Sequence, residues 1–190
     1  MDRYSKTLTW LLRHAVEEMG LHMSEDGYVC VDELLALNQL AGCSEETIRE
    51  IVKKDSKTRF SLREEENKIY IRANQGHSGK VAKQLDPEKY TKLILQPIHP
   101  CIHGTYSRCL ESIKKKGLMV MDREYIHCAA GLPHEVKSGM RTNCDVFIYI
   151  DMKKAMADGI EFRLSDNGVI LTKGVNGVLD PKYFNIVIKF

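Results

Sequence analysis

The pattern of apolar and polar positions predicts that the chain begins with an amphipathic helix over residues 5–19. The apolar residues recur at the i, i+3 and i+4 spacing of such a helix, at Leu8, Leu11, Leu12, Ala15 and Met19. Ser5 is a candidate N-cap and Gly20 a candidate stop. Arg13 and His14 project about 100° apart, off or beside the apolar stripe. This adjacent pair is interpreted either as two ordinary side chains on a partly solvated helix or as part of a functional site.

The next residues predict a short strand, two further helices and a β-hairpin. The strand lies within residues 26–31, and Asp32 and Ser44 can cap the two helices. The hairpin spans residues 57–73, where apolar and charged residues alternate. Together with the first helix, these elements form a winged-helix-like lobe, which we assign to residues 1–75.

The charges of the predicted hairpin suggest an anion site, provided that one register is correct. If residues 64–67 form a four-residue loop, Arg63 faces Lys68 and Arg59 faces Arg72. Like charges directly opposite each other destabilise a sheet, and a visiting anion would relieve the repulsion. A different register would remove this argument.

The second half of the chain has a different pattern. Residues 76–92 combine Gly, Pro and little periodicity, so they are assigned to a linker. From residue 93 the chain is rich in short strands, with a helix ended by Gly117, a short helix within residues 152–159 and a hairpin built on an Asp-Asn-Gly turn. Strands and helices do not alternate regularly, which indicates an α+β fold and a second lobe over residues 93–190.

Composition narrows the function classes. Of the 190 residues, 43% are hydrophobic and 28% charged, as in globular proteins with a core. No apolar run reaches the roughly 18 residues of a membrane span and no secretory signal is recognisable. A cytosolic location is therefore expected, with a nuclear one as the alternative in a eukaryotic host. The net charge of +2 and the lack of a basic arm argue that any polyanion is bound by a local pocket of cations.

The cysteines carry no recognisable site pattern. None of the six is spaced as CxxC, and no Cys/His cluster has zinc-ligand spacing. We therefore expect neither disulfides nor a metal site.

Eight segments occur in an order that matches one known family. They are SKTLTWLLRHA, DGYVCVDELL, KTRFSL, IRANQGHS, HGT, GLMVMDREYIHCA, GMR and SDNGVILT. Over almost its whole length the chain resembles the RNA 2′-phosphotransferase (tRNA 2′-phosphotransferase) family. The resemblance implies an N-terminal winged-helix lobe joined to a C-terminal lobe like that of ADP-ribosyltransferases.

The resemblance also implies a two-step reaction with two substrates. The RNA carries an internal 2′-phosphate left by tRNA splicing, and this phosphate attacks C1″ of NAD⁺ and releases nicotinamide. The 2″-hydroxyl then attacks the phosphorus, which frees the RNA 2′-OH and yields ADP-ribose 1″,2″-cyclic phosphate. NAD is thus a co-substrate, arginines take the place of a metal, and a monomer is expected.

The catalytic residues implied by the resemblance lie on both lobes. Arg13, His14 and Arg59 match family positions on the first lobe, and Arg123 matches one on the second. A guanidinium presents a planar fork suited to phosphate oxygens. His14 is expected to bind the phosphate and to assist proton transfer in the second step. The site would lie in a cleft between the lobes.

Two further cations near the hairpin have less defined roles. The resemblance implies that Lys57 binds the phosphate or the RNA backbone. Arg72 is either a partner of Arg59 or a structural residue. His77 and Ser78 belong to a matching segment, but no role is assigned to them.

The NAD-binding residues implied by the resemblance are His103, Gly104, Thr105, His127, Arg141, Asn167 and Val169. His103 is expected to bind ribose hydroxyls on the adenylate side, and His127 to line the nicotinamide pocket. Gly104 would let the backbone approach the nicotinamide amide, which a Cβ would obstruct.

Two alternatives remain at this stage. One is an enzyme that ADP-ribosylates phosphate ends of nucleic acids without the second step. The other is a winged-helix nucleic-acid-binding protein with an inactive transferase lobe, whose third helix would contact phosphates through Arg49, Lys53 and Lys54.

Overall fold

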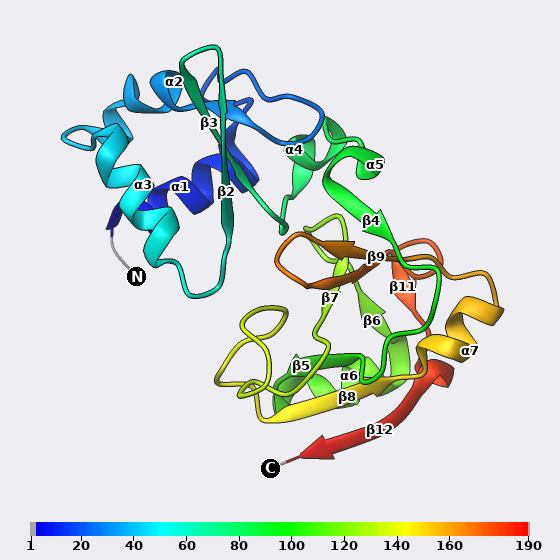
Figure 1. Cartoon of the computed structure of the whole chain (residues 1–190). Coiled ribbons are helices and arrows are strands. Elements are labelled where there is room, and N and C mark those ends of the chain that lie inside the picture. The colour runs from blue at the N-terminus through cyan, green and yellow to red at the C-terminus, as the bar shows by residue number, and fades with distance from the viewer. Residues whose placement is uncertain (1–2, 190) are drawn as a thin grey trace. The chain divides into compact units, whose positions relative to one another are not determined.

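The computed structural model describes residues 3–189 and divides the chain into two compact units (Figure 1). The first unit ends at Tyr90 and the second begins at Thr91. Both contain helices and strands, so the predicted α+β class is confirmed.

The first helix forms the centre of the first unit. Helix α1 (Arg3–Trp10) continues into a π-helical turn, η1 (Leu11–Ala15). The predicted stripe is buried, with Leu8, Leu11 and Leu12 fully inaccessible to solvent. Ser5 is not the N-cap, because the helix begins before it.

The ends of the helices follow local capping chemistry only in part. Gly20 has a φ of +66°, as expected of a stop residue. Asp32 does not cap α2 (Val31–Leu35), because the helix begins one residue earlier, with Cys30 at the cap position. Ser44 does cap α3 (Glu45–Lys54), since its Oγ accepts a hydrogen bond of 3.2 Å from the Thr47 amide. A 3₁₀ turn, η2 (Asn38–Leu40), lies between these two helices.

The hairpin forms with a register that differs from the expected one. Strands β2 (Phe60–Glu65) and β3 (Lys68–Ala73) pair through a two-residue turn in which Glu66 and Asn67 have φ values of +49° and +61°. Two left-handed residues match the twist of a hairpin, so they replace the four-residue loop. Glu65 thereby pairs with Lys68, an attractive cross-strand pair.

The corrected register removes the argument for an anion site that rested on opposed charges. Arg72 lies opposite Ser61, and Arg63 lies opposite Tyr70. Neither Arg59 and Arg72 nor Arg63 and Lys68 face each other. Strand β1 (Val29–Cys30) completes a three-stranded sheet in the order β1-β3-β2.

Most of the segment expected to be a linker is folded into the first unit. It contains α4 (Gly79–Lys83) and α5 (Pro87–Tyr90), which bury Val81 and Tyr90. The Asp86 amide donates to the Glu25 carbonyl at 2.9 Å, and the Lys89 ammonium pairs with the Glu25 carboxylate. These helices are too short to show a period in the sequence, and the first unit extends beyond residue 75.

The second unit is built on two main antiparallel sheets. One has the order β4-β9-β10-β7, the other β12-β8-β5, and β11 and β6 form a small third sheet. The strands are β4 (Thr91–Leu93), β5 (Ile102–Thr105), β6 (Leu118–Met119), β7 (Ile126–Cys128), β8 (Val146–Ile150), β9 (Phe162–Ser165), β10 (Ile170–Thr172), β11 (Val178–Leu179) and β12 (Phe184–Lys189). The helical segments are α6 (Ser107–Lys116), α7 (Met152–Ala157) and the 3₁₀ turn η3 (Pro181–Tyr183).

One bridge connects the two main sheets of this unit. The amides of Ile102 and Ala129 each donate to the carbonyl of the other residue at 2.8 Å. This bridge brings the HGT strand β5 alongside the end of β7, so that His103 and His127 become neighbours. Within the described part of the chain, no helix is both long and apolar enough to cross a membrane.

We predict that Gly117→Ala strongly destabilises the protein. Gly117 has φ +83° and ψ 179°, a region that is essentially restricted to glycine, and a Cβ there would lie 2.4 Å from the Leu179 carbonyl oxygen. Strain and overlap together should lower the free energy of unfolding by about 3 kcal/mol, measured by urea denaturation. Gly159→Ala is the matched control, because φ is +86° but no atom lies within 4 Å of the added methyl. Equal losses in the two variants would contradict the packing argument.

Candidate functional site

The Arg13–His14 pair lies in the π-helical turn η1 of the first unit. This turn buries Leu11, Leu12 and Ala15, while Arg13 is half-buried and His14 is exposed. The two side chains therefore leave the core face of the helix, as the periodicity predicts. A π-helical turn shifts the faces of a helix locally and is frequent at functional sites.

A segment distant in sequence packs against this pair. The Ser78 amide donates to the Arg13 carbonyl at 3.1 Å, and the Ser78 hydroxyl lies 2.6 Å from Nδ1 of His14. A Cβ on Gly76 would lie 3.2 Å from Cζ of Arg13, so the backbone of Gly76 rests against the guanidinium. The residues from 76 to 78 thus contact both members of the pair.

His77 is the buried centre of the same region. Only 2% of the residue is exposed, and within residues 3–189 neither ring nitrogen has a hydrogen-bond partner. Its ring makes an edge contact with Tyr90, with centroids 5.7 Å apart. Burial, and then the positive charges of Arg13, His14 and Arg72, lowers the pKa of His77 to about 3. Two guanidinium groups and the titratable ring of His14 therefore lie close to one neutral ring.

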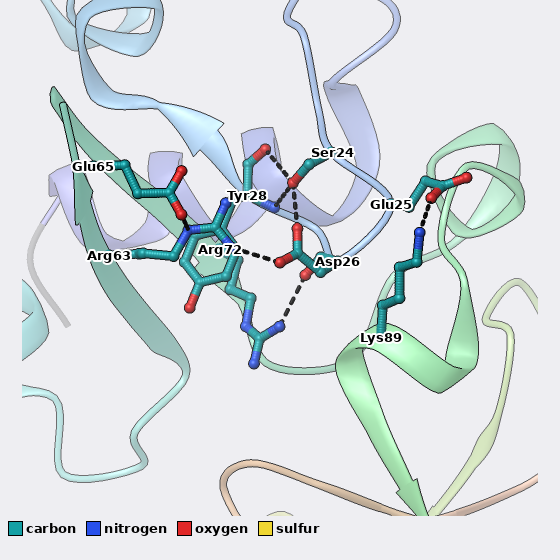
Figure 2. A network of polar contacts seen from close by, with 8 residues as sticks. All are labelled: Ser24, Glu25, Asp26, Tyr28, Arg63, Glu65, Arg72 and Lys89. Carbon is teal, nitrogen blue, oxygen red and sulfur yellow. Dashed lines mark hydrogen bonds and ion pairs between the residues drawn. The ribbon is translucent and has the colours of Figure 1, made fainter.

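Arg72 belongs to a network of polar contacts in the first unit (Figure 2). Its Nη1 donates to the Asp26 carbonyl at 2.9 Å, and its guanidinium lies 4.8 Å from the centre of the Tyr28 ring. Arg63 lies 4.2 Å from the centre of the same ring and pairs with the Asp26 carboxylate at 2.6 Å. These contacts give Arg72 a packing role, while its charge still reaches His77.

Arg59 is oriented by an acidic residue that the sequence reading did not include. Asp55 forms an ion pair with the Arg59 guanidinium and also accepts from the amides of Lys57, at 3.2 Å, and Arg59. Thr58 between them has a φ of +45°, which makes a tight turn. A guanidinium has five N–H groups, so pairing with one carboxylate leaves donors for a phosphate. Asp55 and Arg59 lie in a turn beyond the end of α3, so no helical spacing in the sequence pointed to this contact.

Arg59 is connected to the region of His77 through the backbone. The Asn74 amide donates to the Arg59 carbonyl at 2.8 Å, and Asn74 lies two residues before Gly76. Two residues span at most about 7 Å. We call residues 57–59 the KTR turn. This turn and the Arg13–His14 pair therefore contact the same short stretch of chain, residues 74–78.

In the second unit, a hydrogen bond defines the chemistry of His103. Its Nδ1 lies 2.8 Å from the His127 carbonyl oxygen, which can only accept. Nδ1 must therefore carry the proton, and Nε2 of the neutral ring is an acceptor. Burial lowers the pKa of His103, although the bond to His127 opposes this effect. A ribose hydroxyl is a suitable donor for such a nitrogen.

The neighbours of His103 on β5 are involved in internal packing. A Cβ on Gly104 would lie 2.8 Å from Sγ of Cys144 and 3.0 Å from Cβ of Met140. Glycine is thus required there by the protein's own side chains, which the sequence reading did not anticipate. Thr105 is buried, and its carbonyl accepts from the Asp145 amide at 3.1 Å.

Arg123 and Arg141 influence each other electrostatically within the second unit. Partial desolvation, and then the charge of Arg141, lowers the pKa of Arg123. Nη1 of Arg141 donates to the Tyr106 hydroxyl at 3.3 Å, and the Arg108 guanidinium lies 4.5 Å from the centre of the Tyr106 ring. Positive charge therefore gathers around Tyr106.

The other residues expected to bind NAD lie on β7 and in the β9–β10 turn. His127 is at the centre of β7, opposite Leu171 of β10. The Ser165 hydroxyl donates to Oδ1 of Asn167 at 2.7 Å and accepts from the Val169 amide at 3.0 Å. Val169 is fully buried, so its side chain belongs to the core.

Comparison with known proteins identifies the family. A sequence model described as "RNA 2'-phosphotransferase, Tpt1 / KptA family" matches residues 1–174. The chain belongs to this family. The suspected resemblance is thereby confirmed.

Several family relatives cover nearly the whole chain. A Danio rerio protein named tRNA 2'-phosphotransferase 1 is 44% identical over 188 residues, which cover 96% of this chain and 83% of the relative. A Homo sapiens protein of the same name is 44% identical over 186 residues, 95% of this chain and 72% of the relative. A Schizosaccharomyces pombe relative is 47% identical over 97% of this chain, which spans only 50% of that longer protein.

The expected site residues of this family member fall into groups within each unit. Arg13, His14 and Arg72 share the surroundings of His77 in the first unit, and His103 bonds to His127 in the second. Sequence reasoning missed Asp55 and the contacts of Gly76 and Ser78. Between residues 3 and 189, no group of three His, Cys, Asp or Glu side chains is placed to hold a metal ion, and all six cysteines are free.

We predict that His77 makes the protein less stable in mild acid. The unfolded chain protonates this histidine near pH 6.5, whereas the folded protein does so only near pH 3. The stability contributed by neutral His77 is therefore complete above pH 6.5 and is lost as the pH falls toward 3. Between pH 7 and pH 5, the wild type should lose about 2 kcal/mol more unfolding free energy than His77→Gln. Parallel pH dependences in urea denaturation would contradict this assignment.

Proposed function

We propose that this protein is an NAD-dependent, metal-independent RNA 2′-phosphotransferase that acts as a monomer. It transfers an internal 2′-phosphate of RNA, as left at a tRNA splice junction, to NAD⁺ through an ADP-ribosylated RNA intermediate. The products are 2′-OH RNA, nicotinamide and ADP-ribose 1″,2″-cyclic phosphate. The observation that carries the proposal is the gathering of Arg13, His14 and Arg72 around His77 in a member of this family.

The two units have separate tasks in this proposal. The first unit is a winged-helix-like lobe that binds the RNA phosphate, and its helices and β1-β3-β2 sheet are compatible with that fold. The second is an ADP-ribosyltransferase-like lobe that binds NAD, and its antiparallel sheets with few helices support this assignment.

The phosphate is handled by guanidinium groups and one imidazole. In the first step a phosphate oxygen forms a bond to C1″ as the bond from C1″ to nicotinamide breaks, and Arg13 and Arg59 hold the dianion for this attack. In the second step the 2″-oxygen attacks phosphorus and the RNA 2′-oxygen leaves. Arg13, Arg59 and Arg123 stabilise the charge on the non-bridging oxygens. His14 accepts the proton of the 2″-hydroxyl and delivers it to the leaving 2′-oxygen.

NAD recognition rests on the hydrogen-bond direction at His103. With Nδ1 bonded to the His127 carbonyl, Nε2 accepts from a ribose hydroxyl. Thr105 adds a hydrogen bond, His127 lines the nicotinamide pocket, and Arg141 and Asn167 contact the dinucleotide. Lys57 contacts the RNA backbone. Two residues act through the backbone or through packing, namely Gly104 and Val169.

One reaction separates this function from its alternatives. The protein is incubated with a 5′-labelled RNA that bears one internal 2′-phosphate, with and without NAD⁺. A chelator is added to remove metal ions. NAD⁺-dependent conversion to 2′-OH RNA is the expected result. Accumulation of ADP-ribosylated RNA alone would indicate an enzyme that modifies phosphates without removing them. Binding without turnover would indicate a nucleic-acid-binding protein and would overturn the proposal.

We predict that His14→Ala separates the two steps. Loss of proton transfer should slow the second step by about 100-fold or more, because general acid–base catalysis typically contributes that much. The first step should continue, so ADP-ribosylated RNA accumulates on a sequencing gel. Equal slowing of nicotinamide release and phosphate release would show that His14 has no special role in the second step.

We predict that Arg59→Ala and His103→Ala each raise KM, but for different substrates. Arg59→Ala should raise KM for the 2′-phosphorylated RNA by about 10-fold or more, since a charge-assisted hydrogen bond contributes about 1.5–3 kcal/mol. His103→Ala should raise KM for NAD⁺ by about 5-fold, as a neutral hydrogen bond contributes less. Each variant serves as the control for the other. If either variant changes both constants equally, its assignment to one substrate is wrong.

A further inference from the structure

Three consecutive residues, Gly76, His77 and Ser78, each act on the Arg13–His14 pair in a different way. The backbone of Gly76 lies against the Arg13 guanidinium, His77 is a neutral ring whose pKa responds to Arg13 and His14, and Ser78 bonds to both residues of the pair. We call residues 76–78 the positioning segment. Its contacts join parts of the chain that are 64 residues apart.

Ser78 makes the most specific of these contacts. Its amide donates to the Arg13 carbonyl at 3.1 Å, which fixes the segment to the π-helical turn. Its hydroxyl lies 2.6 Å from Nδ1 of His14, which restrains the imidazole ring. One residue thus holds the backbone of one member of the pair and the side chain of the other.

The Ser78 hydroxyl makes this contact in place of an ordinary capping bond. Ser78 occupies the N-cap position of α4, where serine normally accepts a hydrogen bond from a helix amide and stabilises the helix. Its side chain forms no capping hydrogen bond. The Ser78 hydroxyl therefore contacts His14 and does not stabilise the start of α4. Proteins often lose such local stability at functional sites.

The bond to Nδ1 determines which ring nitrogen is available for chemistry. If the hydroxyl oxygen accepts from Nδ1–H, Nε2 can gain and lose a proton while the bond to Ser78 stays unchanged. His14 would take the proton of the 2″-hydroxyl at Nε2, pass through the imidazolium, and release the same proton to the RNA 2′-oxygen. Protons balance, and the serine hydroxyl neither gains nor loses one. A carboxylate or carbonyl holds the catalytic histidine of other enzymes in the same way.

His77 and Gly76 keep the segment in place. The His77 ring is buried against the edge of Tyr90 and is neutral, so it adds no positive charge to those of Arg13 and Arg72. Gly76 has a φ of +90°, and its missing Cβ leaves room for the Arg13 guanidinium. A larger residue at position 76 would displace the Arg13 guanidinium, and a positively charged residue at position 77 would repel it.

We propose that residues 76–78 position the catalytic pair, and that Ser78 is the positioning residue that holds His14 as its Nδ1–H tautomer with Nε2 directed to the phosphate. The kinetic part of this inference rests on the proposed function. The tautomer itself is a property of the free protein and can be measured without either substrate.

The first test is nitrogen NMR of the free protein labelled with ¹⁵N-histidine. In the wild type, the shifts of His14, identified by comparison with His14→Gln, should indicate that Nδ1 is protonated at neutral pH. Ser78→Ala should move His14 toward the Nε2–H tautomer that free histidine prefers, and Ser78→Thr should retain the wild-type state. An Nε2–H tautomer in the wild type would overturn the proposal, whether or not either Ser78 variant folds and whether or not the protein is an enzyme.

The second test measures the two steps separately in single-turnover reactions. Ser78→Ala should slow the second step by about 5-fold and leave nicotinamide release nearly unchanged, since a hydrogen bond contributes about 1 kcal/mol and about 1.36 kcal/mol is tenfold in rate. Ser78→Thr should recover most of the rate, because the hydroxyl is kept. Equal slowing of both steps in Ser78→Ala, or no recovery in Ser78→Thr, would show that Ser78 is only structural.

Gly76→Ala tests the other side of the segment, with Gly79→Ala as its matched control. Both glycines have positive φ, at +90° and +58°, but a Cβ meets the Arg13 guanidinium only at position 76. Gly76→Ala should therefore raise KM for the 2′-phosphorylated RNA several-fold more than Gly79→Ala, at comparable unfolding midpoints. Equal effects of the two substitutions would contradict a role of Gly76 at Arg13.

Discussion

The placement of Arg13, Arg72 and the titratable His14 around one buried imidazole is the constraint on which the candidate site of the first unit depends. Arg13, His14 and Arg72 all lie near the buried ring of His77, and together with burial they keep that ring neutral. Positive charges at such separations repel each other in a partly desolvated environment. The Ser78 amide bonds to the Arg13 carbonyl, the Ser78 hydroxyl contacts Nδ1 of His14, and the backbone of Gly76 packs against the Arg13 guanidinium, so that these contacts hold the pair in place.

Carboxylates orient the neighbouring cations. Asp55 binds the Arg59 guanidinium and two backbone amides, so that one buried acid organises the whole KTR turn. Asp26 pairs with Arg63, and the aromatic ring of Tyr28 lies against both Arg63 and Arg72. A bidentate guanidinium can serve an acid on one side and a phosphate on another, which makes arginine more suitable than lysine in these positions.

In the second unit, the direction of one hydrogen bond decides which nitrogen of His103 can accept. The bond from His103 to the His127 carbonyl leaves an acceptor nitrogen on a ring whose burial disfavours the charged form. The bridge between Ile102 and Ala129 brings these two histidines together across two sheets. Gly104 leaves room for Cys144 and Met140, which therefore pack against the strand that carries His103.

The sequence by itself determined the features that depend on near neighbours. These are the amphipathic first helix with Arg13 and His14 off its stripe, the Ser44 cap, most strands of the second unit and the α+β class, because periodicity and capping act over a few residues. Strands β4, β6 and β11, of two or three residues each, were not predicted. The ordered motifs also identified the family. Only the tertiary structure decided the two-residue hairpin turn and the docking of residues 79–90 onto the first unit. It alone showed the Ser78–His14 bond, because contacts across 64 residues depend on how the chain packs and leave no periodic signal in the sequence.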